Sequence, residues 1–416
     1  MNELFSFEKT ENYEAFNAFS ENNGGSVYQT SMWASVKNAW NPYYYMGYED
    51  GKEVLSCLCL ERNIPVAGKL WYCPDGFVCD LKNSELIKEF ASFIKKEMKK
   101  YGVFALACDP LLVKKLNGET VDNFEDSLSV FADAGFKVDG VKDFYTVQPA
   151  TTVNVFLTNG EDRLTEEKIL KKCEKGVRHG VRIGRDCGVK CEEYTIEDID
   201  RDPSIADEFF SIMTETSDRV SFIQRDKSYY VNMLRSLGRY GVMDLLYYDI
   251  KGEKARAQSG IMEEKDLERF NSAMKELESA GVSPETEKIY IACGLTSYFG
   301  KTSICLYGGT RNVLRNTFRP THLLNWIRIC RSISRGCEVH DMGRITGDAY
   351  DESNPLYGLC RYKQSYAGTV TEYCGDIYLV NNSIGFFLFT KGLPFAKKMK
   401  NTVLKKMIKK RTVENS

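Results

Sequence analysis

A strand, an amphipathic helix and a second strand follow one another between residues 70 and 108, and this succession constrains the fold most. Residues 70–77 read as an apolar strand that ends in a turn. Residues 85–100 read as a helix whose apolar stripe consists of Leu86, Phe90, Phe93, Ile94 and Met98. Residues 104–108 form a short apolar run, which Asp109-Pro110 ends. Such alternation is typical of an α/β fold.

Asp109 follows the second of these strands directly. In α/β folds, ligands often contact the C-terminal ends of the strands, so this carboxylate is a candidate ligand contact. An aspartate in this place can equally cap a following helix. Both interpretations of Asp109 stay open at this point.

Residues 28–37 combine a helix start with an aromatic and a cation. The break at Gly24-Gly25 lets a helix begin near Thr30 or Ser31, whose hydroxyls suit an N-cap. Trp33 and Lys37 then share one face of the helix. An aromatic beside a cation at a helix start suits an anionic, sugar-bearing ligand. The alternative is a core tryptophan beside a solvated lysine.

Two later stretches repeat this pairing of cation and aromatic. Arg225 and Tyr229 are four residues apart, and arginine is the better bidentate partner for phosphate. In residues 358–368, Lys363 follows Tyr362 in a stretch bracketed by glycines. A cation held there, partly desolvated, suits stabilisation of a developing oxyanion. Gly308-Gly309, directly after Tyr307, predicts a close approach of the backbone to a neighbour.

The chain is long enough for two or three domains, and a faint internal echo suggests two copies of one module. Residues 48–54, at the turn of a predicted hairpin, resemble residues 248–254, and we therefore predict a similar hairpin over 243–262. Residues 263–288 read as a short helical hairpin inserted between two strands, with Ser283-Pro284 starting its second turn.

The net charge of −2 excludes a chain that is basic as a whole, so any surface for a polyanion must be local. One helix is predicted from about 165 to 185, and residues 168–190 hold eight Lys or Arg and two acids. This face suits phosphate contacts, or it is simply a solvated helix face. Residues 391–411 hold nine basic residues, no acid and apolar residues at helical spacing. This tail suits an anionic lipid surface, or packing on the first domain.

The remaining features predict a cytoplasmic protein without a metal site. We find no basic, apolar leader at the start and no apolar run of about 18 residues. The 14 cysteines lack the paired spacing of zinc ligands, and Cys57, Cys59, Cys73 and Cys79 read as buried small hydrophobes. His340 has no nucleophile motif beside it, which argues against a catalytic role.

These motifs together resemble the Fem family, the aminoacyl-tRNA-dependent transferases that build peptidoglycan cross-bridges. The resemblance lies in the order of five pieces: Tyr28-Gln29-x-Ser31-x-Trp33-Ala34-x-x-Lys37, Tyr72-Cys73-Pro74-Asp75-Gly76, Asp109-Pro110, Tyr307-Gly308-Gly309-Thr310 and Tyr362-Lys363. It implies two tandem GNAT-like (acetyltransferase-like) α/β domains. We place them at 1–149 plus 372–416, closed by a C-terminal strand near 372–380, and at 150–371.

The resemblance also implies residue roles. Lys37 and Arg225 would hold the diphosphate of the murein precursor, with Trp33 and Tyr362 beside the bound substrates. Tyr229 and Tyr307 would line its peptide or sugar. Asp109 would lie beside the acceptor amine, and Lys363 would steady the tetrahedral intermediate. No cofactor is implied: aminoacyl-tRNA is the co-substrate, and lipid II or UDP-MurNAc-pentapeptide is the acceptor.

Three features of the chain bear on this resemblance. Residues 263–288 are short where many members carry a coiled-coil arm, and Tyr362 replaces a usual phenylalanine. The glycine-rich pyrophosphate loop of acetyl-CoA enzymes is not visible, which disfavours an acyl-CoA-dependent enzyme.

The second interpretation is a non-catalytic accessory protein of the same fold that binds murein precursor or tRNA. The tail would add a peripheral contact at the inner face of the plasma membrane.

Overall fold

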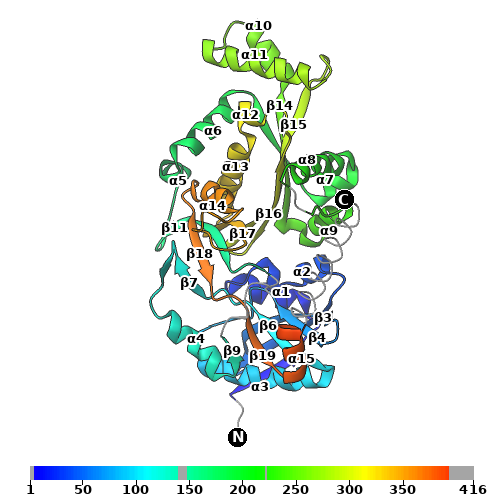
Figure 1. Cartoon of the computed structure of the whole chain (residues 1–416), viewed down its shortest axis with the longest axis vertical. Coiled ribbons are helices and arrows are strands. Elements are labelled where there is room, and N and C mark those ends of the chain that lie inside the picture. Colours follow the sequence, from blue (N-terminus) through cyan, green and yellow to red (C-terminus); the bar gives the residue numbers. More distant parts are fainter. Residues whose placement is uncertain (1–3, 139–147, 221–222, 393–416) are drawn as a thin grey trace, which may run out of the picture. The chain divides into compact units, whose positions relative to one another are not determined.

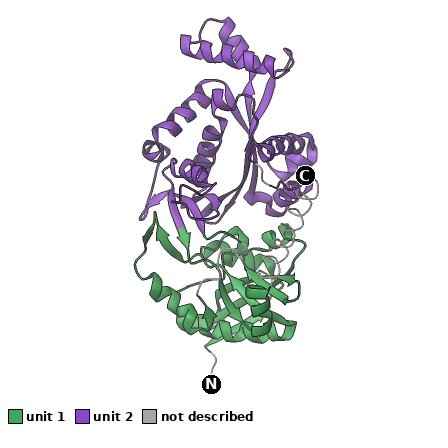
Figure 2. Cartoon of the chain, in the orientation of Figure 1, with its two compact units in different colours: residues 1–150, 372–416 green, residues 151–371 purple. Residues whose placement is uncertain are grey.

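The structure is a computed structural model of the chain that describes residues 4–138, 148–220 and 223–392 (Figure 1). The chain divides into two compact units, Met1–Ala150 with Glu372–Ser416, and Thr151–Thr371 (Figure 2). The sequence placed this division between residues 149 and 150 and between 371 and 372. The basic tail lies outside the described residues beyond Gly392.

The first unit is built on one sheet with helices on both faces. Its strands are, in spatial order, β1 (Phe5–Lys9), β2 (Asn41–Glu49), β3 (Lys52–Ile64), β4 (Gly68–Cys73), β6 (Val103–Cys108), β19 (Ile377–Val380) and β9 (Phe136–Lys137). Neighbouring side chains on β2 point to opposite faces. Tyr45 packs on Phe93 of α3 (Ser84–Tyr101), whereas Tyr44 packs on Phe16 of α1 (Tyr13–Asn22).

The second unit repeats this arrangement. Its sheet contains, in order, β13 (Val189–Tyr194), β14 (Gly241–Asp249), β15 (Lys288–Phe299), β16 (Thr302–Thr310), β17 (Val339–Ile345), β10 (Thr151–Phe156) and β18 (Thr369–Tyr373). Cys293 on β15 contacts Phe209 of α8 (Ser204–Val220), and its neighbour Gly294 contacts Arg328 of α13 (Pro320–Ser334). Helices α8 and α13 therefore cover opposite faces of this sheet (Figure 1).

The two sheets share one topology. In each, four antiparallel strands precede a parallel neighbour that a crossover helix connects, β4–α3–β6 in the first unit and β16–α13–β17 in the second. The next strand is antiparallel and comes from a distant part of the sequence. In the first unit it is β19, which pairs with β6 from Ile377↔Cys108 to Val380↔Ala105. The predicted closure of the first domain by a C-terminal strand is confirmed.

The predicted hairpin over 243–262 is wrong. The first-half hairpin turns through Asp50 and Gly51, both with positive φ, as a tight two-residue turn requires. In the second half, the Asp249 side chain accepts a hydrogen bond from the Gly252 backbone N–H at 2.9 Å and caps helix α10 (Ile250–Gln258). The two similar stretches of sequence therefore form two different local structures.

The helical insertion lies between β14 and β15 but is shifted toward the N-terminus from its predicted place. It consists of α10 and α11 (Glu264–Ser279) (Figure 1). Ser283-Pro284 does not begin a helix, because this segment leads into β15, and the Pro284 carbonyl accepts from Lys254 Nζ at 2.7 Å. Among the described residues, no helix combines the length and the apolarity that crossing a membrane demands.

Candidate functional site

Strands β16 and β17 of the second unit form a strand fork, which we define as residues 305–310 of β16 and 342–345 of β17. Their parallel pairing runs from Thr302↔Val339 to Ile304↔Asp341, although both strands continue past this point. Backbone groups that no longer pair across the two strands are available to other polar groups. A polar side chain can therefore enter where the ladder ends.

Lys363 supplies that side chain from α14 (Tyr357–Gln364), and its Nζ donates to the Gly343 carbonyl at 2.7 Å. Gly343 has a φ of +91°. A Cβ at this position would lie 3.1 Å from the Cys305 carbonyl oxygen and 3.5 Å from Lys363 Nζ. Glycine is thus favoured both by the backbone conformation and by the close approach of the Cys305 carbonyl, whereas Lys363 Nζ lies at ordinary contact distance.

Two opposing effects act on the Lys363 ammonium. Burial lowers the pKa of Lys363, and the nearby Asp341 carboxylate raises it. Asp341 is itself fixed, because it accepts from the Thr152 hydroxyl at 2.5 Å and from the Gly343 N–H at 2.7 Å. The sequence predicted a partly desolvated cation here, and the structure adds the carboxylate that favours its charged form.

The other groups around the fork hold it in place. The Tyr362 hydroxyl bonds to Asn325 Nδ2 at 3.1 Å and to the Tyr366 hydroxyl at 2.7 Å, which anchors α14 to α13. The substrate-binding role of Tyr362 stays a prediction.

His340 is buried, and its Nδ1 lies 2.8 Å from the Ser303 hydroxyl. Burial lowers the pKa of His340 to about 3, so this ring stays neutral and serves the core.

A second group of predicted residues meets at Tyr307, which belongs to the β16 side of the strand fork. Arg225 precedes α9 (Lys227–Leu237), whose cap Asp226 accepts from the Tyr229 N–H at 2.8 Å. The Arg225 guanidinium lies 5.2 Å from the Tyr229 ring centroid, and that ring meets the Tyr307 ring edge-on at 6.4 Å. Tyr229 and Tyr307 are partly exposed and Arg225 is exposed, so this cluster is open to a ligand.

Arg328 fixes Tyr307, and the sequence analysis missed it. Its side chain is buried at 2% exposure, and its Nη2 donates to the Tyr307 carbonyl at 2.7 Å. A Cβ at Gly294 would lie 1.6 Å from the same Nη2, and one at Gly308 would lie 3.5 Å from Nη1. The sequence predicted that the backbone at Gly308-Gly309 closely approaches a neighbour. It did not predict that this neighbour is Arg328, because nothing in the apolar pattern of its helix indicates a buried arginine.

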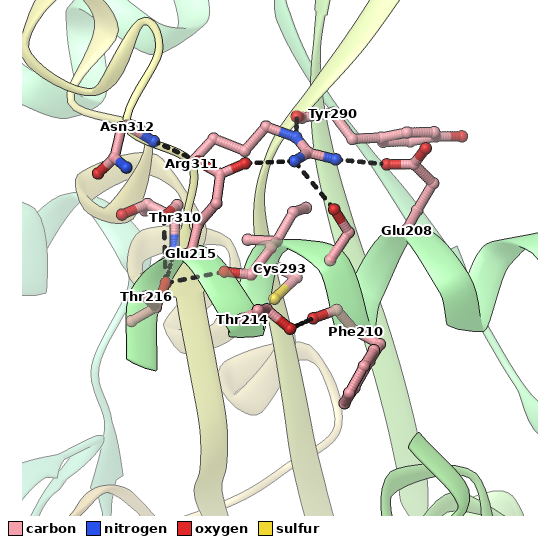
Figure 3. A network of polar contacts seen from close by, with 12 residues as sticks. Glu208, Phe210, Thr214, Glu215, Thr216, Tyr290, Cys293, Thr310, Arg311 and Asn312 are labelled. Carbon is pink, nitrogen blue, oxygen red and sulfur yellow. Dashed lines mark hydrogen bonds and ion pairs between the residues drawn. The ribbon is translucent and has the colours of Figure 1, made fainter. Parts of the chain in front are cut away.

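On the face of the sheet opposite Arg328, helix α8 holds the end of β16 (Figure 3). Arg311 forms ion pairs with Glu208 at 2.8 Å and with Glu215 at 2.5 Å. The Thr216 hydroxyl donates to the Thr310 carbonyl at 3.0 Å and accepts from the Thr310 N–H at 2.8 Å. Together with Arg328 on the opposite face, these contacts hold β16 from both faces of the sheet.

In the first unit, the predicted helix start and the Trp33–Lys37 pair are confirmed. The Thr30 hydroxyl accepts from the Trp33 N–H at 3.1 Å and caps α2 (Ser31–Val36). Lys37 Nζ lies 4.9 Å from the Trp33 ring centroid, and Trp33 packs on Tyr28 at 4.4 Å between ring centroids. Trp33 is buried, so it belongs to the core and still presents its ring to the lysine.

The alternative interpretation of Asp109 as a helix cap is wrong, since β7 (Val113–Leu116) follows it. Asp109 lies at the end of the parallel pair β4 and β6, the position of the first unit that corresponds to the fork. Its carboxylate accepts from the Tyr72 hydroxyl at 3.0 Å and from the Asp75 N–H at 2.9 Å. These bonds hold a buried carboxylate at the C-terminal end of the strands.

The basic segment forms two helices, and the single helix predicted over 165–185 is wrong. Helix α5 (Glu166–Lys172) ends at Cys173, because the Glu174 N–H donates to the Ser365 carbonyl at 2.8 Å, and α6 (Lys175–Asp186) follows. Gly180 and Gly184 of α6 leave no room for a Cβ against His322 and Leu323. This close packing on α13 turns the basic face of α6 outward.

Cations from three elements surround His179 on that face. Slight burial lowers the pKa of His179, and four cations lower it further: Arg182 of α6, Arg319 before α13, and Lys265 and Arg269 of α11. In the part of the chain that the structure describes, Arg182, Arg319 and Lys265 are exposed and have no carboxylate within 4.0 Å. We call Arg182, Lys265, Arg269 and Arg319 the basic cluster.

The structure thus groups Arg225 with Tyr229 and Tyr307, Lys363 with Asp341, and Lys37 with Trp33. The cysteines predicted as small hydrophobes are confirmed for Cys57, Cys59 and Cys73, which are fully buried in the first core. Among the described residues, no group of three or more His, Cys, Asp or Glu is arranged to hold a metal ion.

Known proteins resemble the chain over nearly its full length. A lipid II:glycine glycyltransferase of Staphylococcus epidermidis is 26% identical over 415 residues, covering 92% of this chain and 94% of that protein. One of Staphylococcus saprophyticus is 27% identical, with 86% and 89% covered. The crystal structure of FemX matches with a TM-score of 0.77 at 22% identity, covering 92% of this chain and all of that one.

The structural match confirms the predicted α/β fold with two tandem GNAT-like domains. The sequence matches the FemAB family over residues 10–252 and 243–390, which together take in both units. On this match the chain belongs to the FemAB family.

Proposed function

We propose that this protein transfers an amino acid from aminoacyl-tRNA to the stem-peptide amine of a lipid II-like peptidoglycan precursor and so builds a cross-bridge. The observation that carries the proposal is Lys363, a partly desolvated ammonium with a fixed carboxylate beside it in the strand fork. The names of the relatives, lipid II:glycine glycyltransferases, support the acceptor.

The reaction needs positioning and one charge-stabilising group. The neutral amine attacks the ester carbonyl, and the C–N bond forms. The C–O bond to the ribose then breaks, and the proton that the amine nitrogen loses goes to the ribose oxygen, which leaves as a hydroxyl. An aminoacyl ester is already activated, so the main tasks are to align two substrates and to stabilise the oxyanion. Lys363 donates to that oxyanion. Lys37 on Trp33 and Arg225 on Tyr229 hold the precursor diphosphate, and Asp109 accepts from the attacking amine.

The test is to incubate the protein with lipid II and a pool of charged tRNAs and to weigh the product. A mass increase of one or more aminoacyl residues, abolished by ribonuclease, is the expected result. Precursor binding without any mass increase would favour the accessory protein instead. Transfer that survives ribonuclease and needs acyl-CoA would contradict aminoacyl-tRNA as the donor.

We expect the pH profile of turnover to report on Lys363. The attacking amine must be neutral, so the rate rises with pH, and it falls again when Lys363 loses its proton. Because burial lowers the pKa of Lys363, this fall comes below the ordinary lysine value of 10.5. Asp341→Asn removes the charge that raises this pKa, so the alkaline limb moves to lower pH. An unshifted limb would contradict the pairing of Asp341 with Lys363.

Three members of the basic cluster, Arg182, Lys265 and Arg319, are exposed and have no carboxylate within 4.0 Å among the described residues. Such cations suit backbone phosphates, and they support aminoacyl-tRNA as the donor. We expect Arg182→Glu with Lys265→Glu to raise the KM for aminoacyl-tRNA by about tenfold or more and to leave precursor binding unchanged. The matched control is Lys301→Glu, an exposed lysine that pairs with Glu338. Steady-state kinetics at several salt concentrations measure the effect, and equal KM values for both variants would oppose this role.

A further inference from the structure

Helix α15 of the first unit is apolar on both of its faces. It comprises Ser383–Phe387 and continues as a short π-helix over Leu388–Gly392. Phe386 packs on Tyr378 at 5.4 Å and Phe389 on Phe104 at 5.7 Å between ring centroids, so these two residues face the core. Ile384 and Phe387 lie on the other face and are 73% and 61% exposed. Helices that are apolar all round are normally buried or in contact with lipid.

A third exposed apolar residue lies next to this helix. A Cβ at Gly385 would lie 2.8 Å from the Ala67 carbonyl oxygen, so α15 rests on the turn between β3 and β4. The neighbour of Ala67, Val66, is 81% exposed and has a φ of +60°, which is unusual for a β-branched residue. We call Val66, Ile384 and Phe387 the apolar rim.

Positive charge accompanies the apolar rim. Lys137 is exposed, and its Nζ lies 4.9 Å from the Phe386 ring centroid. Arg62, two residues before the buried Ile64 at this end of β3, is exposed and lies over Trp40. The sequence from Lys391 to Arg411 then adds nine basic residues and no acid. Apolar side chains flanked by cations match the chemistry of an anionic lipid surface, with acyl chains beneath phosphates.

We propose that the apolar rim inserts into an anionic lipid bilayer, with the described cations Lys137 and Arg62 on the lipid phosphates. The charge around the rim selects this occupant over a second copy of the chain, because identical basic surfaces repel each other. This inference goes beyond the proposed function and does not depend on it, since lipid binding can be measured without turnover.

The first test is co-sedimentation of the full chain with vesicles that contain phosphatidylglycerol or only phosphatidylcholine. We expect the wild-type chain to bind the phosphatidylglycerol vesicles and to be released by salt. Val66→Ser with Ile384→Ser and Phe387→Ser should weaken this binding at least tenfold, since three exposed apolar groups are lost. The matched control is Ile261→Ser, which changes a 70% exposed isoleucine of the second unit and should bind as wild type.

Three outcomes of these experiments would overturn the proposal. The first is that the wild-type chain does not bind, and the second is that the triple variant binds as well as wild type. The third is a dimer in light scattering without lipid that the triple variant dissociates, because the rim would then be an interface between copies. A second measurement is quenching of Phe387→Trp fluorescence by brominated lipids. We expect quenching there and none for Ile261→Trp, and equal quenching of both would also refute insertion.

Discussion

Replacing Lys363 by methionine is expected to lower the rate of aminoacyl transfer by roughly a hundredfold or more. Methionine keeps much of the side-chain length but removes the donor that meets the oxyanion, and losing one such donor costs about 10²–10³ in rate. Precursor affinity should stay nearly unchanged, because the diphosphate is assigned to Lys37 and Arg225. Single-turnover kinetics and calorimetric titration with the precursor measure the two quantities separately.

A suitable control is Lys301→Met, which removes an exposed lysine of the same unit that pairs with Glu338. Turnover of Lys363→Met within a few-fold of wild type would show that Lys363 does not stabilise the oxyanion. Equal loss of rate and of precursor affinity would instead show that Lys363 binds the ground state.

The second large effect is expected on stability, from Asp244→Asn. Asp244 is fully buried and pairs with Arg331 at 2.8 Å and with Arg328 at 3.7 Å. Arg331 retains Glu193 as a partner, but Arg328 is left in the core without a carboxylate. Breaking a buried pair on one side typically costs about 3–5 kcal/mol, because a charge stays buried and uncompensated.

Hydrogen exchange of the amides of β14, β15 and β16 measures this loss locally, which suits a chain of two units. The opening free energy of these strands should fall by about 3–5 kcal/mol, with the first unit unaffected. Glu193→Gln is the control, since Glu193 is exposed and loss of its charge should cost less than about 1 kcal/mol. Similar values for the two variants would show that Asp244 does not hold the arginine pair.

The same substitution also tests how the site is built. Arg328 donates to the carbonyl of Tyr307, so a displaced arginine should shift the tyrosine that is predicted to line the precursor. We therefore expect Asp244→Asn to raise the KM for precursor even at temperatures where the fold is intact. Arg328 thus belongs both to the core, through Asp244, and to the site, through Tyr307. The periodicity of the sequence does not predict this double role.

The sequence determined the features that depend on short separations. Trp33 with Lys37 and Arg225 with Tyr229 are four residues apart, and both pairs are in contact in the structure. Lys37 is the C-cap of α2 and Arg225 lies before the N-cap of α9, so the predicted shared helical face of Arg225 and Tyr229 is wrong, and the short separation alone brings each pair together. The strand, helix and strand between residues 70 and 108, the cap at Thr30 and the motif order that resembled the Fem family were readable for the same reason. The tandem fold followed from that order.

Tertiary structure decided what depends on contacts between distant segments. Asp341 and Gly343 reach Lys363 only because β16 and β17 part after Ile304, and no local pattern encodes that point. The basic helix breaks at Cys173 because the Glu174 N–H bonds to Ser365, nearly two hundred residues away. Arg328 looks like a surface residue in sequence, since its burial depends on two glycines and a carboxylate from other strands. Charged and polar groups take their roles from partners that only the fold supplies.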